Sequence, residues 1–258
     1  MRIPVYARVV LGFAVVVSVA ARGNAETRTP VVFGCDGRDL ATAKARWTAG
    51  DAAIRKTVND IIADADRALD VKPPSVVEKP FTPPSGDKHD YMSLSPYWWP
   101  DPKKPDGLPY IRKDGQFNPE RSKYDLDRFE TMARSVEHLG LAYYFTGNEK
   151  YAAKARDFIR VWFFDEATRM NPNLRFAQTR PGHKGTQPSG VIEGMRLRGV
   201  IDADGLLKGS SHWTDDDSAR LKAWFKDLLS YLIDSEQGKA EAKSRNNHGT
   251  FYGVQTAS

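Results

Sequence analysis

The chain has 258 residues, of which 40% are hydrophobic and 28% charged. This composition is typical of globular proteins and excludes collagen-like, disulfide-stapled and wholly disordered chains. The length suits one large domain or two small ones. A formal net charge of +5 suggests an acidic partner, but residues 1–25 hold three arginines and no acidic residue, so that without them the net charge is +2. Local clusters of charge are therefore more informative than the total.

The first 25 residues are typical of a secretory signal peptide. Arg2 and Arg8 provide a positively charged start, the run Val9 to Ala21 is apolar, and Gly23-Asn24-Ala25 offers a cleavage site with small residues. An uncleaved membrane anchor is the less favoured alternative, because the apolar run is shorter than the ~20 residues that span a bilayer. We expect a periplasmic or secreted protein with no stable membrane insertion after cleavage, and a mature domain over residues 26–258.

Several kinds of chemistry find no support in the sequence. Cys35 is the only cysteine, so an internal disulfide or a thiolate zinc site is excluded, and a small half-buried side chain is the favoured interpretation. The five histidines include no pair at the spacing of a helical metal site, and P-loop, nucleophile-elbow and dinucleotide motifs are absent. Paired carboxylates for glycoside hydrolysis stay open, because their separation in space cannot be read from a sequence.

The periodic segments are helical. Apolar residues recur every three or four positions in four stretches, which are Ile54–Leu69, Phe129–Tyr143, Tyr151–Trp162 and Leu221–Leu232. The second and third stretches are joined by the turn Thr146-Gly147-Asn148, which predicts an antiparallel helical hairpin. Thr214 and Asp217 resemble a capping box before the fourth stretch, and Gly238 is placed to end that helix. Since no segment shows sustained alternation, the predicted fold class is mainly α, without a large sheet.

Two irregular stretches interrupt the helices. Eleven of the 16 prolines fall between Pro73 and Pro119, which excludes a helix there. The many aromatic residues in this stretch disfavour disorder, so we expect an ordered segment that lies over the helical scaffold. The second stretch, Asn171 to Gly190, contains five side chains able to donate hydrogen bonds to an anion, namely Gln178, Arg180, His183, Lys184 and Gln187. The alternative interpretation of this second stretch is a solvated polar loop.

The first stretch also contains three consecutive aromatic residues, Tyr97-Trp98-Trp99, near the cations Lys103, Lys104, Arg112 and Lys113. Aromatic faces match the C–H faces of sugar rings, and cations match carboxylates or phosphates. An acidic polysaccharide would satisfy both features, and so would a nucleic acid. The structural alternative is that the Trp pair fills the core under the loop.

The segment Ser244 to Thr250 is the most concentrated polar cluster. It contains Arg245 and the triplet Asn246-Asn247-His248, and it leads directly into Phe251-Tyr252. Adjacent amides and an imidazole can bind and neutralise a carboxylate, which suits the removal of a proton beside that carboxylate as enolate-like charge builds up. The alternative is that His248 is a hydrogen-bonded core histidine or a neighbour of a helix N-cap.

Three stretches taken together carry a family resemblance. They are Asp90–Pro102 with its continuation to Glu120, Met170–Gln178, and Asn246–Tyr252. They resemble the alginate lyase domain superfamily of bacterial periplasmic polysaccharide lyases, over a range from about Val31 to the last residue. The resemblance implies an (α/α) toroid, an incomplete α/α barrel of helical hairpins with a substrate groove. It also implies β-elimination of a uronate polymer such as alginate or glucuronan, with an acidic polysaccharide rather than a nucleic acid as partner and with no metal or organic cofactor.

The resemblance also implies roles for individual residues. The Asn-His pair of the family neutralises the substrate carboxylate, which assigns that role to Asn247 and His248. A tyrosine then acts as base and acid with an arginine close by. Tyr252 is the only tyrosine near the motif and is the catalytic candidate, although the family places its tyrosine farther along the chain. The implied groove residues are Trp98, Trp99, Arg112, Gln178, Arg180 and Arg245.

Members of this superfamily continue well beyond the Asn-Asn-His motif, whereas this chain stops at Ser258. We therefore expect a toroid domain that is incomplete at its C-terminus, catalytically defective and poorly folded, because apolar stripes would be left uncovered. Two other functions stay open at this point. One is a non-catalytic protein that binds acidic polysaccharide and lacks the proton-transfer tyrosine, and the other is a helical-toroid glycoside hydrolase with two carboxylates.

Overall fold

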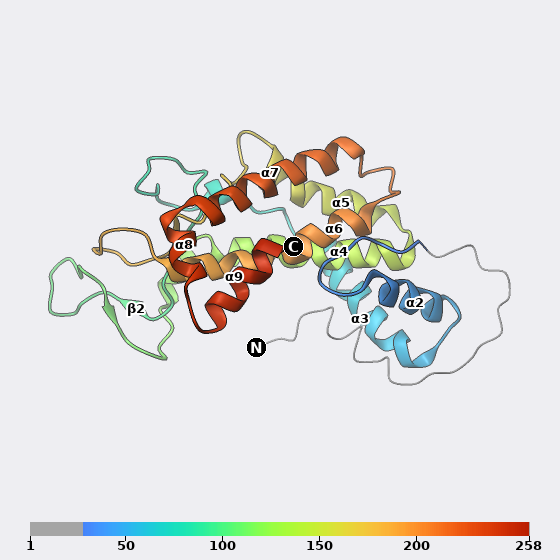
Figure 1. Ribbon diagram of the computed structural model, residues 1–258, viewed down its shortest axis with the longest axis horizontal. Coiled ribbons are helices and arrows are strands. Elements are labelled where there is room, and N and C mark those ends of the chain that lie inside the picture. Colours follow the sequence, from blue (N-terminus) through green and yellow to red (C-terminus); the bar gives the residue numbers. More distant parts are fainter. Residues whose placement is uncertain (1–27, 258) are drawn as a thin grey trace. The chain divides into compact units, whose positions relative to one another are not determined.

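The computed structural model describes residues 28–257, so the expected signal peptide, residues 1–25, lies outside the described residues. The described part is mainly helical, as predicted, and its strands are short (Figure 1). The chain divides into two compact units. Unit 1 comprises the described part of Met1–Lys72 together with Ala133–Phe158 and Arg198–Ser218. Unit 2 comprises Pro73–Met132, Ile159–Leu197 and the described part of Ala219–Ser258. Among the described residues, no helix combines the length and the apolar character needed to cross a membrane.

Unit 1 is built from helices. They are α2 (Gly37–Thr48), α3 (Ala52–Leu69), α6 (Arg198–Leu207) and the larger parts of α4 (Leu126–Thr146) and α5 (Glu149–Ile159). Helices α2 and α3 each start at an aspartate N-cap, since the carboxylates of Asp36 and Asp51 accept the backbone N–H groups of Arg38 and Ala53 at 2.8 Å. Such caps satisfy N–H groups that have no partner inside the helix, and each stabilises a helix by about 1 kcal/mol.

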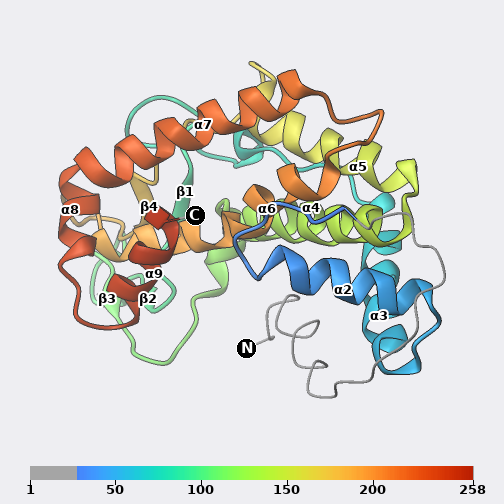
Figure 2. The same cartoon turned by 45° about the vertical axis from the view of Figure 1, so that its right-hand side comes forward.

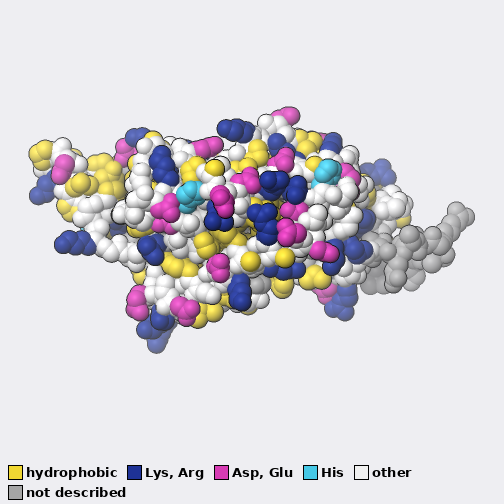
Figure 3. Space-filling model, turned by 90° about the horizontal axis from the view of Figure 1, so that it is seen from above, with side chains coloured by type: hydrophobic (Ala, Val, Ile, Leu, Met, Phe, Trp, Pro, Cys, Tyr) yellow, Lys and Arg dark blue, Asp and Glu magenta, His cyan; other side chains and the backbone are white. Residues whose placement is uncertain are grey.

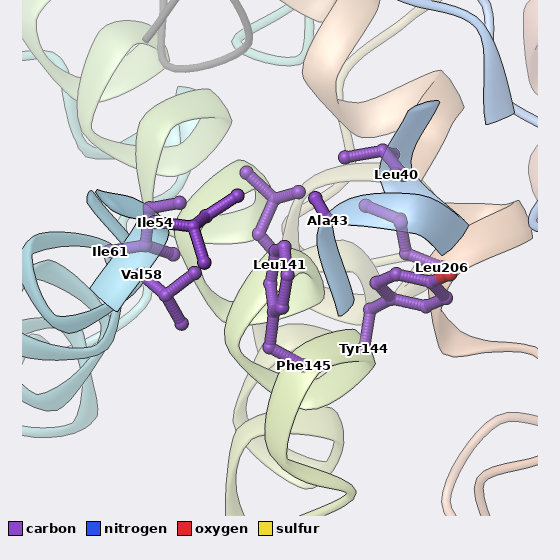
Figure 4. Packing of buried hydrophobic residues seen from close by; sticks show 9 residues of the cluster. All are labelled: Leu40, Ala43, Ile54, Val58, Ile61, Leu141, Tyr144, Phe145 and Leu206. Atoms are coloured by element: carbon purple, nitrogen blue, oxygen red, sulfur yellow. The ribbon is translucent and has the colours of Figure 1, made fainter. Parts of the chain in front are cut away.

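The core of unit 1 is an apolar cluster (Figure 4). Four helices contribute buried side chains to it, namely Leu40, Ala43, Ile54, Val58, Ile61, Leu141, Tyr144, Phe145 and Leu206. The one hydroxyl in the cluster, that of Tyr144, donates to the carbonyl oxygen of Arg28 at 2.9 Å. Burying a large aliphatic or aromatic side chain of this kind stabilises a fold by roughly 1.5–3 kcal/mol.

Helices α4 and α5 form the predicted helical hairpin. Gly147 lies in the turn between them with φ +67°, the left-handed conformation that glycine adopts without strain after a helix. Helix α5 continues into a π-helical turn, η3 (Arg160–Phe164), whose Trp162 is fully buried. The apolar stripe from Tyr151 to Trp162 is therefore confirmed as the buried face of one continuous helical segment.

Unit 2 combines helices with short strands. Its helices are the larger part of α7 (Asp215–Asp234), α8 (Glu236–Ala242), α9 (Asn247–Ala257) and the 3₁₀ segments η1 (Val76–Glu78), η2 (Pro119–Lys123) and η4 (Pro188–Leu197). Strand β1 (Met92–Leu94) pairs in parallel with β4 (Phe176–Thr179), and β2 (Trp98–Trp99) pairs antiparallel with β3 (Ile111–Arg112). The prediction that no large sheet forms is confirmed for the described residues, since each sheet has two strands.

The proline-rich stretch is ordered, as predicted, and is attached to the start of α4 by a buried ion pair. The Lys79 ammonium lies 2.9 Å from the Asp125 carboxylate, and both side chains are fully buried. Lys79 also donates to the carbonyl oxygen of Lys88 at 2.7 Å, and Asp125 accepts the backbone N–H of Met92 at 2.9 Å. These bonds fix the course of the chain on its way into β1.

Helix α7 begins as predicted and ends differently. Thr214 Oγ1 accepts the backbone N–H of Asp217 while the Asp217 carboxylate accepts that of Thr214, both at 3.1 Å, which confirms the capping box. The prediction that Gly238 ends this helix is wrong. Helix α7 ends at Asp234, and Ser235 caps α8, which contains Gly238. A Cβ atom at position 238 would overlap the carbonyl oxygen of Leu232, so glycine is required for the tight turn between α7 and α8.

Candidate functional site

His248 lies in the first turn of α9 and is held by a buried carboxylate. Its ring nitrogen Nδ1 lies 2.6 Å from Glu241 Oε1 in α8, and the Glu241 side chain is only 2% exposed whereas that of His248 is 24% exposed. Because a carboxylate accepts hydrogen bonds, Nδ1 carries the proton in this contact. The other ring nitrogen, Nε2, is then the one that a ligand can use. No sequence pattern points to Glu241, because it lies in α8 and its partner His248 lies in α9, after the turn between the two helices.

Two asparagines precede this histidine at the helix start. The side-chain oxygen of Asn246 accepts the backbone N–H of His248 at 3.0 Å and so caps the helix. Asn247 is the first residue of α9, and it and Arg245 are exposed. The N-terminus of a helix carries partial positive charge, which favours an anion. The predicted Asn247–His248 pair is thus accessible at an end of a helix that suits a carboxylate.

Tyr252 lies one helical turn after His248, a spacing that places both residues on the same face of α9. The Tyr252 hydroxyl donates to the carbonyl oxygen of Leu232 at 3.1 Å and so attaches α9 to the end of α7. The predicted role as base would require the phenol to leave this bond. That role stays a prediction.

Gln178 occupies a strained position in β4. Its φ of +51° is the one positive value among the described residues other than glycine, a conformation that costs of order 1–3 kcal/mol. Its backbone N–H donates to Ser93 Oγ and its carbonyl oxygen accepts from Ser95 Oγ, both at 2.7 Å. Strained backbone of this kind persists only where the surroundings hold it, and it is concentrated at functional sites.

A second buried carboxylate supports this position. Glu193, in η4, accepts the hydroxyls of Tyr91 at 2.8 Å and Ser93 at 2.7 Å. Burial raises the pKa of Glu193, although these hydrogen bonds oppose the shift. Ser93 therefore connects the buried Glu193 to the backbone of Gln178. No local pattern marks Glu193 in the sequence, because its partners lie about a hundred residues earlier in the chain.

The structure joins the two irregular stretches at Trp98, which is half-buried rather than a plug of the core. Trp98 faces Arg112 across the β2–β3 pair. From the second stretch, the Arg180 guanidinium carbon lies 4.5 Å from the centre of the Trp98 ring, and the His183 ring meets it edge-on at 4.7 Å. Burial, together with the neighbouring charge of Arg112, lowers the pKa of Arg180. We call these four residues the Arg112–Arg180 cluster.

Trp99 is also half-buried, and it has different partners. Its indole N–H donates to the carbonyl oxygen of Gln116 at 2.9 Å, and the Lys113 ammonium lies 5.0 Å from the centre of its ring. The partners of Trp99 therefore belong to the first irregular stretch, whereas Trp98 contacts Arg180 and His183 of the second.

Backbone contacts fasten the two stretches together beside the cluster. The N–H of Tyr110 donates to the carbonyl oxygen of Pro181 at 2.9 Å, and the His183 Nε2–H donates to the carbonyl oxygen of Tyr110 at 2.8 Å. Gly182 has φ +80°, and a Cβ there would lie 2.6 Å from the Cα of Pro109. Glycine thus permits the close approach on which the cluster depends.

The predicted site residues lie at one end of unit 2. Figures 1 and 2 both place the β2–β3 hairpin at the same end of this unit as α8 and α9. Strand β4 packs on η4, which in turn contacts α8 and α9. The Gln237 amide of α8 donates to the carbonyl oxygens of Gln187 at 2.7 Å and Leu174 at 3.2 Å, so that α8 also holds both ends of the second irregular stretch.

The surface has no single sign of charge. Lys and Arg side chains are interspersed with Asp and Glu over the face shown in Figure 3, and hydrophobic side chains gather at the end where Figure 1 places the β2–β3 hairpin. Within residues 28–257, no group of three or more His, Cys, Asp or Glu side chains is arranged to hold a metal ion. Because basic and acidic side chains alternate over the face in Figure 3, an excess of positive charge is found only locally there.

A mainly helical chain that gathers arginines, a tryptophan and an Asn-His pair at one end of a compact unit has the features of a helical toroid polysaccharide-lyase fold. The comparisons with known proteins specify the family. The alginate lyase family model matches residues 75–258, and the chain belongs to this family.

A solved relative supports the same assignment. The crystal structure of an alginate lyase from Bacteroides ovatus shares 44% sequence identity with the chain at a TM-score of 0.84. The match covers 88% of this chain and 60% of that protein, so the chain spans less than two thirds of the length of its relative. A search among curated proteins gave no match. The resemblance to alginate lyases and the helical toroid fold class are thereby confirmed.

Proposed function

We propose that this protein is a polysaccharide lyase that cleaves a uronate polymer, such as alginate or glucuronan, by β-elimination. Membership of the alginate lyase family and the likeness to the Bacteroides ovatus enzyme support the reaction class. The observation that carries the proposal is the His248 ring, held 2.6 Å from the buried Glu241 beside Asn247 at the start of α9. This arrangement is suited to binding a carboxylate.

The proposed reaction removes the C5 proton of a uronate, which lies next to the carboxylate. The electrons of the C5–H bond form a C4=C5 double bond, and the oxygen at C4 leaves with the electrons of the glycosidic bond and takes up a proton. Negative charge accumulates on the substrate carboxylate as the C5 proton departs. The Asn247 amide and the Nε2–H of a protonated His248 stabilise that charge, which is worth roughly 10²–10³ in rate for one donor. Tyr252 is the proposed proton carrier, on the family resemblance.

Glu241 has a positioning role in this proposal. A buried carboxylate on Nδ1 fixes the orientation of the ring and balances the charge of the imidazolium, as the aspartate does in Ser-His-Asp enzymes. Nε2 is then directed to the substrate at every encounter. The fold achieves this with a carboxylate that the substrate never touches.

One assay tests the reaction class. The chain is incubated with alginate, polymannuronate and glucuronan, and the ultraviolet absorbance of the new C4=C5 bond is followed. We expect absorbance to grow with at least one polymer and to be lost in His248→Ala, while the exposed His212→Ala, a matched control in unit 1, retains it. Affinity without absorbance would identify a binding protein, and new reducing ends without absorbance would identify a hydrolase. Either result overturns the proposal.

The protein is also proposed to act outside the cytoplasm, on the strength of the sequence of residues 1–25. Fractionation of cells that express the full chain with a C-terminal tag tests this. The expected result is tagged protein in the periplasm or medium with a new N-terminus near Glu26. Uncleaved protein in the cytoplasm would contradict it.

A further inference from the structure

Helix α9 contains two glycines, although alanine is the better helix former. Ordering a glycine in a helix costs more backbone entropy than ordering an alanine. Gly249 and Gly253 lie one turn apart in this helix of 11 residues. Among the described residues, a Cβ on Gly253 would meet no atom within 4 Å beyond its own helix backbone, whereas a Cβ on Gly249 would overlap the carbonyl oxygen of Ser244. Packing therefore accounts for glycine at position 249 and not at position 253.

The atom that Gly249 meets belongs to the backbone, so it cannot move aside as the end of a flexible side chain could. Ser244 lies in the connection between α8 and α9, and its backbone N–H donates to the carbonyl oxygen of Glu241 at 2.9 Å. The carbonyl carbon of Ser244 would also lie only 3.1 Å from the added Cβ. The start of α9 can therefore approach the end of α8 this closely only with glycine at position 249.

The next turn of α9 limits how the helix could adjust. The Tyr252 hydroxyl donates to the carbonyl oxygen of Leu232 at 3.1 Å, which attaches this turn to the end of α7. A larger residue at position 249 would push the start of α9 away from Ser244 while this bond holds the following turn. The displacement would therefore fall mainly on the first turn, which contains His248.

The contact most sensitive to such a displacement is the one between α8 and the His248 ring. Nδ1 of His248 lies 2.6 Å from Glu241 Oε1, and a shift of about 1 Å would lengthen this distance beyond that of a hydrogen bond. Gly249 and His248 are adjacent, and their partners Ser244 and Glu241 lie three residues apart at the end of α8. The two contacts therefore share one short piece of backbone on each side.

We propose that Gly249 is a positioning residue for His248. Its missing side chain lets the first turn of α9 approach the end of α8, and this approach brings the imidazole within reach of Glu241. The inference rests on the proposed function for the role of His248 at the substrate carboxylate. Gly249 itself has no contact with the substrate in this proposal and acts through the placement of the ring.

Gly249→Ala tests the proposal, and Gly253→Ala is its matched control, because each adds one methyl group to α9. In Gly249→Ala we expect kcat on the cleaved polymer to fall about 10- to 100-fold with a smaller change in KM, since a misplacement of about 1 Å has effects of this size. Gly253→Ala should keep kcat within about twofold of the unchanged chain. The low-field proton resonance of His248 Nδ1–H, which reports the bond to Glu241, should shift or vanish in Gly249→Ala alone.

A second background separates positioning from a general loss of structure. If Gly249 acts through the contact of Glu241 with His248, Gly249→Ala should lower kcat by less than about threefold in a chain that already carries Glu241→Gln. An equal loss in both backgrounds would overturn the proposal, because the methyl group would then act independently of this contact. A Gly249→Ala chain without a native urea transition would assign Gly249 a role in folding and would also overturn it.

The resonance keeps this test separate from that of the lyase reaction. If the unchanged chain produces no ultraviolet absorbance with any polyuronate, the proposed function fails, and the His248 resonance still reports on Gly249. A change confined to Gly249→Ala then supports the positioning of the ring. Identical resonances in Gly249→Ala, Gly253→Ala and the unchanged chain overturn it.

Discussion

The two units differ in what their buried carboxylates bind. In unit 1 the central cluster is made of aliphatic and aromatic side chains, and its single hydroxyl is satisfied. Both units also bury charged groups, which include Asp202 and Asp217 in unit 1 and the Lys79–Asp125 pair, Glu193 and Glu241 in unit 2. Apolar burial contributes directly to stability, whereas a buried ion pair contributes little or nothing net, because desolvation offsets the attraction between its charges. The buried charges of unit 2 therefore call for an explanation other than stability.

Three buried carboxylates of unit 2 hold segments that lead to the candidate site. Asp125 binds the backbone at the start of β1, Glu193 binds the serine that holds Gln178, and Glu241 binds the ring of His248. Positioning of site residues is thus the common consequence of these contacts. In unit 1 the buried Asp202 accepts the backbone N–H of Gly34 and the buried Asp217 accepts that of Thr214, and none of the candidate site residues lies in this unit.

The largest effect is expected from breaking the buried ion pair. Lys79→Met leaves the Asp125 carboxylate buried without its partner, which should lower the free energy of unfolding by about 3–5 kcal/mol. Urea denaturation measures the change. The double variant Lys79→Met/Asp125→Asn removes both charges and should recover most of the loss. A double variant as unstable as the single one would show that the pair stabilises the fold outright.

A cavity in unit 1 should be costly for a different reason. Leu141→Ala removes buried apolar contacts from the cluster and should lower the free energy of unfolding by about 2–5 kcal/mol. The same urea titration measures it. Unlike the loss in Lys79→Met, this loss cannot be restored by removing a second charge, because Leu141 has no charged partner in the cluster. An effect below 0.5 kcal/mol would contradict the view that unit 1 depends on this cluster.

The helices of both units were largely predictable, because their signals are local. The stripes from Phe129 to Tyr143 and from Leu221 to Leu232 lie in α4 and α7, and the Thr214 cap forms as expected. The prediction for Gly238 is wrong because the need for glycine at this position comes from a tertiary contact. The close approach of the Leu232 carbonyl oxygen, rather than a helix end, requires glycine there.

The candidate site was predictable only in part. Arg180, Trp98 and His248 stand out in the sequence because their residue types are suited to binding acidic sugars. The residues that position them do not stand out in the sequence. Glu241 binds His248 across the turn between two helices, and Glu193 binds Ser93 from a hundred residues farther along the chain. A carboxylate looks the same in a sequence whether it is buried or exposed. Which residues position the site therefore emerged only from the structure.

A smaller effect should come from changing the group that holds His248. Glu241→Gln retains the size of the side chain, but its amide cannot balance the charge of the imidazolium, and an N–H turned toward Nδ1 favours the neutral ring. The equivalent change in Ser-His-Asp enzymes lowers kcat by about 10⁴. Since the proposed role of His248 is to stabilise charge rather than to act as the base, we expect a fall of roughly 10- to 100-fold in kcat with a smaller change in KM.

The ring itself provides a second measurement. Nitrogen-15 shifts of the His248 imidazole should change in Glu241→Gln and stay constant in Glu236→Gln, an exposed glutamate on the same helix. The measurement does not depend on turnover. Unchanged ring shifts in Glu241→Gln would remove Glu241 from the positioning role.

The smallest effect concerns a carboxyl group of unit 1, that of Glu137. Burial, the largest cause, raises the pKa of Glu137 on α4 to about 7, while the charge of Arg198 opposes the shift. Between pH 4.5 and 7 the native state keeps this proton while the unfolded chain loses it, so stability falls as pH rises through that window. Glu137→Gln cannot ionise, and the loss of stability between pH 5 and pH 8 should shrink by roughly 1–2 kcal/mol. Urea titrations at the two pH values measure the difference.

Burial also raises the pKa of Asp125 to about 6. This gives the stability of both proteins a further pH dependence of the same sign, which cancels when the two proteins are compared. Equal slopes in the two proteins would show that the Glu137 carboxyl is solvated in the native state.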